Sequence, residues 1–346
     1  MTKTKSSKRT ILIILLVLFT LFLAGGGISA YFLFLPNFDA QKTTYIYIYP
    51  DKDFDNLCLQ LQDSADCKHI NTFKQVAQLM KYPEAMKTGR YAIEPGMNNL
   101  DLIKRLKRGN QEPIRITFNN MRVREDLISR LSEQLMIDDN ELEVLMNDVS
   151  YCESFGFTPQ TIKIMFIPNT YEVYWNISAD NLMKRMKREY DAFWTESRRN
   201  KANRIGISTI EVATLASIVE EESAMSDEYP VIAGLYINRL HKGIPLQADP
   251  TVKYALGDFA LQRVLNEHLK VESPYNTYLN SGLPPGPIRI PSITGMDAVL
   301  NYKKHNYLYM CAKEDFSGRH NFAVTLAEHN RNANRYRAAL NQRGIR

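Results

Sequence analysis

The spacing of hydrophobic and polar residues predicts an order of elements in the first third of the chain. Residues 43–50 (TTYIYIYP) alternate as a half-buried strand does. Two helical segments follow, at residues 54–61 and 71–81, and then a short strand at residues 89–96. An amphipathic helix at residues 100–109 stops at a glycine, and another strand opens at residue 113. We therefore expect a compact strand–helix–helix–strand unit over residues 44–118.

Helical periodicity dominates the rest of the chain. Residues 123–136, 140–148 and 181–194 carry it within a mostly helical connecting region at 119–204. A final domain over residues 205–346 begins with GISTIEVATLASIVEEES, in which Ser208 and Glu211 form the Ser-x-x-Glu pattern that starts a helix. A second helix precedes Gly243. The mixture of elements predicts an α+β fold.

The end of the first helix of that final domain carries three consecutive glutamates. A helical projection places Glu222 within the apolar stripe, Glu220 just past its edge and Glu221 on the solvent side. The stripe is formed by the apolar residues Val212, Leu215, Ala216, Ile218 and Val219. A carboxyl on a buried stripe has a raised pKa, which is the condition that a general acid needs. The alternative is a frayed helix end with no chemical role.

The N-terminal residues predict the compartment. Residues 10–35 contain no charged side chain, and a helix needs roughly 20 apolar residues to cross a membrane. Residues 1–9 carry four cations, so we expect a cytoplasmic basic tail, an uncleaved single-pass anchor in the inner membrane and a periplasmic remainder. A cleaved signal peptide is the alternative. The net charge of +5 comes largely from that tail, and no basic cluster on a folded region indicates nucleic-acid binding.

The spacing of the cysteines and histidines gives little indication of a disulfide or of a metal site. Cys58 and Cys67 bracket a short segment that a disulfide could close in an oxidising compartment, and two unrelated buried thiols are the alternative. His320 and His329 lie nine residues apart without an acidic partner at ligand spacing, so we expect no metal site. Residues 273–292 (SPYNTYLNSGLPPGPIRIPS) combine prolines with amides, hydroxyls and aromatic rings. That composition suits an open groove for a sugar polymer.

Several long motifs carry a resemblance to a known family. They are LASIVEEES, INRLHKGIPLQADPTVKYALG, SPYNTYLNSGLPPGPI and the later HNF and EHN. Together they resemble the YceG-like (MltG) family of endolytic murein transglycosylases along nearly the whole chain. The resemblance implies a LysM-like domain at 44–118 and a transglycosylase domain at 205–346. It also implies a lyase of cell wall biogenesis that cleaves nascent peptidoglycan strands internally, leaves 1,6-anhydro-N-acetylmuramic acid ends, and works beside the peptidoglycan synthesis machinery.

The resemblance also assigns residues. The family pattern Val-Glu-x-Glu followed by a small residue falls on Val219 to Ser223, and its second glutamate, the catalytic one, is Glu222. The lysine usual at the middle position is Glu221 here. Substrate contacts are implied for Glu220, Asn238, Gln247, Asp249, Tyr275, Asn276 and Thr277.

One glutamate suffices for the implied reaction. Glu222 would protonate the leaving oxygen and then accept the proton of the C6 hydroxyl as the anhydro ring closes, with no metal or organic cofactor. A hydrolytic muramidase would instead need a second carboxylate, for which Asp249 is the nearby candidate. A non-catalytic peptidoglycan-binding scaffold would use the same groove, with Glu222 as a structural acid.

Overall fold

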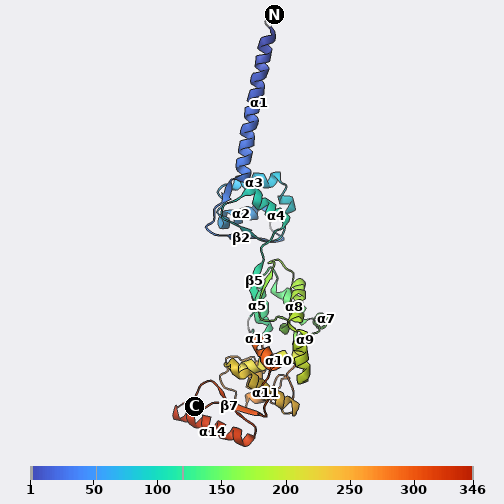
Figure 1. The fold of residues 1–346 in the computed structure, drawn as a ribbon, viewed down its shortest axis with the longest axis vertical. Coiled ribbons are helices and arrows are strands. Elements are labelled where there is room, and N and C mark those ends of the chain that lie inside the picture. Colours follow the sequence, from blue (N-terminus) through green and yellow to red (C-terminus); the bar gives the residue numbers. More distant parts are fainter. Residues whose placement is uncertain (1–2, 52, 119–120, 345–346) are drawn as a thin grey trace. The chain divides into compact units, whose positions relative to one another are not determined.

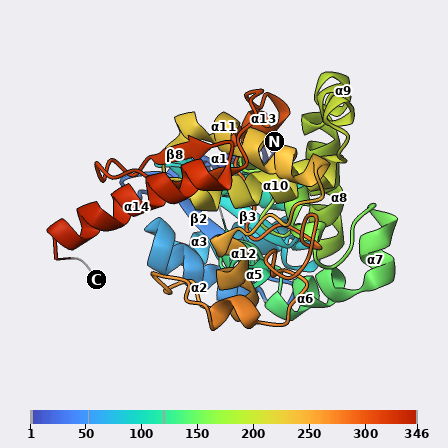
Figure 2. The same ribbon diagram turned by 90° about the horizontal axis from the view of Figure 1, so that it is seen from below.

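A computed structural model describes residues 3–51, 53–118 and 121–344, drawn in Figures 1 and 2. The chain divides into two compact units. The N-terminal unit comprises residues 1–115 and 172–176, and the C-terminal unit comprises residues 116–171 and 177–346. Apart from residues 172–176, the predicted connecting region thus shares one unit with the predicted final domain.

The N-terminal unit begins with the long helix α1 (Lys3–Phe34). Among the residues that the structure describes, no helix combines the length and the hydrophobicity needed to cross a membrane, so the anchor predicted for residues 10–35 is not found there. Nothing is described of the side chains of residues 1–8, 21–26 and 28–30, which belong to the predicted tail and anchor.

The predicted strand–helix–helix–strand order is confirmed in this unit. It consists of β2 (Thr44–Ile48), α2 (Phe54–Ala65), α3 (Ile70–Leu79) and β3 (Gly89–Ile93), and β2 pairs with β3 in antiparallel fashion. The alternation in β2 buries Ile46 and Ile48 and leaves Tyr45 exposed. A second pair, β1 (Pro36–Phe38) with β4 (Met97–Asn98), precedes α4 (Asn99–Arg108).

Local signals set the ends of these helices. Asp53 and Asn98 accept hydrogen bonds from backbone N–H groups in the first turns of α2 and α4. Gly109 ends α4 in the left-handed conformation that a glycine adopts without steric cost, as the sequence predicts. Of the two alternatives that the sequence leaves open for Cys58 and Cys67, the structure has the unbridged one: both are free thiols, with Cys58 buried and Cys67 partly buried.

The C-terminal unit is mainly helical. Its early part contains α5 (Arg124–Ser132), α6 (Asp139–Asn147), α7 (Val149–Ser154), α8 (Ala179–Phe193) and α9 (Glu196–Ile205). Its later part contains α10 (Thr209–Glu222), α11 (Tyr229–His241), α12 (Asp249–Leu256), α13 (Ile293–Leu300) and α14 (Leu326–Gln342). The strands β7 (Tyr309–Ala312) and β8 (His320–Ala323) of this unit pair with each other. The strands β5 (Ile114–Thr117) and β6 (Thr170–Val173), which also pair, each contain residues of both units. The helix α14 packs against the β7–β8 hairpin (Figures 1 and 2).

The helix α10 is the centre of the C-terminal unit. The expected capping box is confirmed, because Ser208 and Glu211 bond each other's backbone N–H groups. Helices α9, α11, α12 and α13 all pack against α10. Every residue from 212 to 220 is consequently buried.

The helices around α10 show that the helical projection was wrong about the environments of Glu220 and Glu221. The projection assumes one buried face, whereas α10 is enclosed on most of its circumference. Glu220 is therefore the most buried of the three glutamates, with a side chain that is 2% exposed. Glu221 does not face open solvent, because Arg122 and Arg289 hold its side chain at 3.1 and 2.6 Å. The period of the helix alone does not single out Glu222.

Candidate active site

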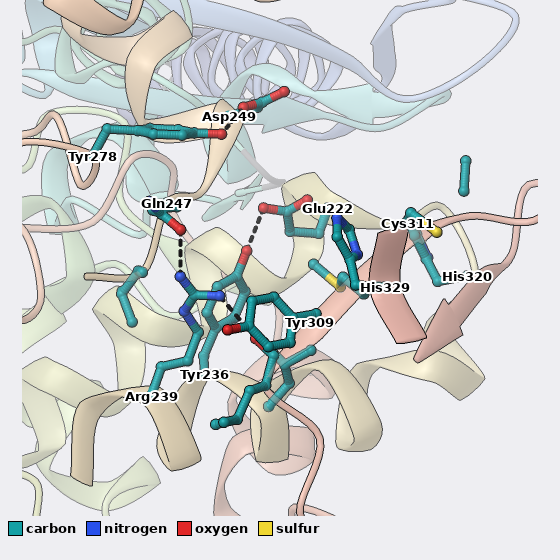
Figure 3. A pocket seen from close by; sticks show the side chains of 15 residues that line it. Glu222, Tyr236, Arg239, Gln247, Asp249, Tyr278, Tyr309, Cys311, His320 and His329 are labelled. Carbon is teal, nitrogen blue, oxygen red and sulfur yellow. Dashed lines mark hydrogen bonds between the residues drawn. The ribbon is translucent and has the colours of Figure 1, made fainter. Parts of the chain in front are cut away.

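A pocket of about 340 Å³ lies in the C-terminal unit at the end of α10 (Figure 3). Its walls come from α10, α11, the loop before α12, the start of α12, residue 278, the β7–β8 hairpin and α14. The polar and aromatic lining residues are Glu222, Tyr236, Arg239, Gln247, Asp249, Tyr278, Tyr309, Cys311, His320 and His329. Three residues that the sequence nominated, Glu222, Gln247 and Asp249, thus line one cavity.

Glu222 is the last residue of α10 and faces this pocket. Its side chain keeps partial exposure to the cavity but lies among buried neighbours. Desolvation raises its pKa from an ordinary 4.5 to about 7, and the negative charge of Asp249 adds to the rise. The hydroxyl of Tyr236 donates a hydrogen bond to Oε1 at 2.5 Å and opposes it (Figure 3). A carboxyl of this kind carries a proton in a substantial fraction of molecules at neutral pH.

Tyr236 and Arg239 form the floor beside Glu222, both on α11. The pKa of Tyr236 is raised well above its usual range by burial, so its hydroxyl stays a donor. The guanidinium of Arg239 donates to the carbonyl oxygens of Pro245 at 2.9 Å and Leu308 at 2.8 Å. It thereby ties the loop before α12 to the start of β7.

Gln247 is held in an unusual backbone conformation. Its φ of 53° lies in the left-handed region, which is costly for a residue with a side chain. Its Oε1 accepts from Arg239 at 2.6 Å, and its N–H donates to the Thr277 carbonyl at 3.1 Å. Contacts on both sides therefore keep this amide at the pocket wall.

Asp249 stands at the start of α12 and accepts a hydrogen bond from the Tyr278 hydroxyl at 2.6 Å. Burial and that carboxylate raise the pKa of Tyr278. The pocket therefore holds two carboxyl groups of different character, because Asp249 is exposed and Glu222 is half-buried.

Other nominated residues lie outside the pocket lining. Glu220 accepts from the backbone N–H of Ser292 at 2.8 Å and from its hydroxyl, and burial raises its pKa. Asn238 donates to the carbonyl oxygens of His305 at 2.7 Å and Tyr307 at 3.1 Å. Both side chains therefore connect α10 or α11 to later segments.

The three consecutive residues 275–277 support the loops around the pocket. Tyr275 packs its ring against Tyr254 at 4.7 Å between centroids. Asn276 is buried and donates to two carbonyl oxygens of its own loop. The hydroxyl of Thr277 accepts from the Ala248 N–H at 3.0 Å, next to Gln247.

Sequence reasoning missed most of the aromatic and basic lining. Tyr236 and Tyr309 come from helix and strand positions that resemble ordinary core residues, and no local pattern marks them. Arg239 lies within the motif INRLHKGIPLQADPTVKYALG, but the resemblance assigned it no role. His320 and His329 belong to the HNF and EHN motifs, but the sequence indicated no substrate role for either. Among the residues that the structure describes, no cluster of three or more His, Cys, Asp or Glu side chains could hold a metal ion.

Comparisons with known proteins find named relatives of this chain. An endolytic murein transglycosylase of Bacillus subtilis strain 168 is 37% identical over 166 residues, which are 48% of this chain and 45% of that protein. One of Streptococcus pneumoniae strain R6 is 26% identical over 361 aligned residues, with 92% of this chain and 64% of that protein covered. The chain thus spans 45 to 64% of the length of these curated relatives.

A solved structure and a family model extend the comparison. The crystal structure of a YceG-like protein from Listeria monocytogenes is 26% identical with a TM-score of 0.55, covering 84% of this chain and 99% of that chain. A model of the YceG-like family matches residues 46–335, which include every residue of the pocket. Because this match extends over most of the sequence, the chain belongs to the YceG-like family.

Proposed function

We propose that this protein is an endolytic peptidoglycan lytic transglycosylase with Glu222 as its catalytic acid and base. The observation that carries the proposal is a single half-buried carboxyl, with a pKa near 7, in a pocket of the family's matched region. Relatives named endolytic murein transglycosylase support the same activity. The bond cleaved would join N-acetylmuramic acid to N-acetylglucosamine, and such cuts would limit strand length.

The first step is general acid catalysis. Protonated Glu222 gives its proton to the glycosidic oxygen as the bond to the anomeric carbon breaks, so the leaving sugar departs as an alcohol. Positive charge develops on the remaining sugar ring. The carboxylate formed at Glu222 keeps the hydrogen bond from Tyr236, which stabilises the negative charge.

The second step closes the anhydro ring. The C6 hydroxyl of the same sugar attacks the anomeric carbon, and the Glu222 carboxylate accepts the hydroxyl proton. The acid is thereby regenerated, and no water enters the products. We propose that Gln247 and Asp249 bind sugar hydroxyls around this centre, since both line the pocket and each is held by a neighbouring side chain.

Hydrolysis by two carboxylates is the rival reaction. Asp249 lines the same pocket as Glu222 and could activate water as a general base. Mass spectrometry of the new chain ends decides between the two, with the full chain acting on peptidoglycan strands. We expect 1,6-anhydro ends from the parent protein and from Asp249→Asn. If the parent protein instead produced reducing ends, and Asp249→Asn no longer did, the protein would be a hydrolase. If the parent protein cleaved no strands at all, only the binding scaffold would remain.

The N-terminal unit supports a second proposal, that it is a LysM-like domain that binds glycan. Tyr45 in β2 and Tyr49 just after its end are four residues apart and exposed, and the face of an aromatic ring can stack on a sugar ring. Replacing both by serine in the full chain should weaken binding to peptide-free glycan strands. Unchanged binding would contradict the proposal.

Attachment to the inner membrane, beside the synthesis machinery, is a further proposal that rests on the sequence. The uncharged residues 10–35 and the four cations before them are its support. Membrane fractionation of the full chain and of a chain beginning at residue 36 tests it. Equal recovery of both in the soluble fraction would refute it.

A further inference from the structure

Three polar side chains form a hydrogen-bonded group that begins at Ser223, next to Glu222 in the sequence, and has no part in the reaction steps above. Ser223 and Glu228 are buried, and His320 is partly exposed. Ser223, the residue after Glu222, donates its hydroxyl to Glu228 Oε2 at 3.0 Å. Glu228 ends the short turn between α10 and α11, and its side chain is only 8% exposed. A buried carboxyl is costly unless it accepts hydrogen bonds, and the further donors to Glu228 come from a strand that lies far along the chain.

That strand is β8, which forms a wall of the pocket. His320 Nδ1 lies 2.9 Å from Glu228 Oε2, and the backbone N–H of His320 donates to Oε1 at 3.0 Å. The His320 side chain is 14% exposed and lines the same pocket as Glu222. Glu228 therefore links the end of the catalytic helix to a pocket histidine.

This link determines which ring nitrogen remains for a ligand. A carboxyl that already accepts from Ser223 and from a backbone N–H acts as an acceptor, so the imidazole proton lies on Nδ1. Within the described part of the chain, Nε2 has no hydrogen-bond partner. In the neutral ring it presents a lone pair, which accepts a hydrogen bond from a hydroxyl or an amide N–H.

We infer that His320 is a glycan-binding residue whose Nε2 accepts a hydrogen bond from a hydroxyl or acetamido N–H of the sugar, and that Glu228 is the positioning residue that fixes its tautomer. The inference rests on the proposed function for the identity of the ligand. Because Ser223 and Glu222 are consecutive, the network also joins the end of α10 to the strand that carries this acceptor.

Replacement by asparagine separates the two hydrogen bonds of His320, the one that Nδ1 donates to Glu228 and the one that Nε2 would accept from the sugar. In His320→Asn the amide N–H₂ replaces Nδ1 and can still donate to Glu228, whereas nothing replaces Nε2. The matched control is Asp227→Asn, which removes the neighbouring carboxylate from an exposed ion pair with Arg319 on the same hairpin. Both variants are made in full-length Glu222→Gln protein, so that binding is measured without cleavage.

Binding of peptide-free peptidoglycan strands gives the first readout. We expect His320→Asn to weaken binding about fivefold to tenfold, the size of one lost hydrogen bond, with the melting temperature preserved. Asp227→Asn should bind as its parent does. Equal affinity of the His320→Asn protein and its parent, or an equal loss in the control, would overturn the inference.

The tautomer gives a second readout that does not depend on activity. Nitrogen-15 NMR at alkaline pH, where a histidine ring is neutral, should show a protonated Nδ1 and a bare Nε2 at His320. Glu228→Gln offers an amide in place of the carboxyl and should move population to the Nε2-protonated form, with weaker glycan binding. A protonated Nε2 in the parent protein would refute the role of Glu228.

The proposed function can fail separately. If the parent protein cleaves no glycan but His320→Asn still weakens binding, the scaffold alternative holds and the inference about His320 stands. If the parent releases anhydro ends and His320→Asn binds normally, the inference alone fails.

Discussion

Replacement of Glu222 by glutamine is the most informative single change, because it alters both activity and pH-dependent stability. Glutamine keeps the size of the side chain and an oxygen that can accept from Tyr236, but it carries no transferable proton. General acid–base catalysis contributes about 10²- to 10⁴-fold. We expect the release of anhydro ends to fall by at least that factor, with glycan binding retained.

The raised pKa of Glu222 determines the direction and the magnitude of the pH-dependent change in stability. The group titrates near 4.5 in the unfolded chain and near 7 in the fold, so the folded state binds more protons between those values. Its contribution to stability is fully present below about pH 4.5 and is lost as the pH rises past 7. At about 1.4 kcal/mol per pH unit, and with pocket water screening part of the charge, the loss is about 1 to 3 kcal/mol.

Thermal unfolding of the parent protein and Glu222→Gln, between pH 4.5 and pH 8.5, measures this loss. Glutamine at position 222 does not titrate, so the variant does not lose this stability as the pH rises. The melting temperature of Glu222→Gln should therefore increase relative to that of the parent by about 2 to 10 °C over that range. Asp227→Asn is the control, since an exposed carboxyl whose pKa is lowered by its bond to Arg319 does not titrate in this window.

Two results would refute the reasoning about Glu222. Cleavage within tenfold of the parent rate would remove it as the acid, and a melting difference that does not change with pH would show that the group is not desolvated. In the parent protein we also expect the rate to decline as the pH rises above about 7, since the proton needed for the first step is then lost.

Three other changes test the surroundings of the site. Arg239→Lys removes donors that a lysine cannot replace, so cleavage should fall about tenfold or more and the melting temperature should drop; an unchanged rate would contradict the role of Arg239 in holding Gln247. Gly234→Ala would place Cβ 2.4 Å from the Lys303 carbonyl oxygen, so chemical denaturation should show a free energy of unfolding lower by about 1 to 3 kcal/mol. An unchanged free energy of unfolding would mean that the backbone around Lys303 moves to accommodate the methyl group. Lys163 is buried and its pKa is lowered from 10.5 to about 8, so this group binds more protons in the unfolded chain between those values. The difference in free energy of unfolding between the parent and Lys163→Met should therefore move in favour of the parent as pH rises from 8 to 10.5, and a constant difference would contradict the burial of this ammonium.

Short-range interactions explain which parts of the fold could be predicted from the sequence. The capping box of Ser208 and Glu211, the left-handed stop at Gly109 and the alternation in β2 each involve residues within a few positions of one another. The two helix ends follow from the local chain, whatever surrounds it, and the alternation of β2 can be read from its own period of two, although its partner β3 lies far along the chain. Specific motifs also identified the family, and a match over residues 46–335 confirms it.

Long-range packing decided the environment of the three glutamates. Periodicity along α10 gives the angular position of each side chain but not what lies beside it. Four helices from other parts of the chain enclose α10, and so Glu220 is buried against Ser292 and Glu221 is paired with Arg122 and Arg289. Desolvation depends on those neighbours, and therefore only the tertiary structure assigns the raised pKa of Glu222.

The pocket itself is likewise a product of tertiary structure. Tyr236 and Arg239 lie on α11, while Tyr309 and His320 lie on strands about seventy residues or more later in the chain. No spacing rule connects such positions, because a cavity is formed where separate segments fail to fill the space between them. The sequence by itself determined the family and the elements whose signals are local, and the packing of all the elements determined which side chains share a site with Glu222.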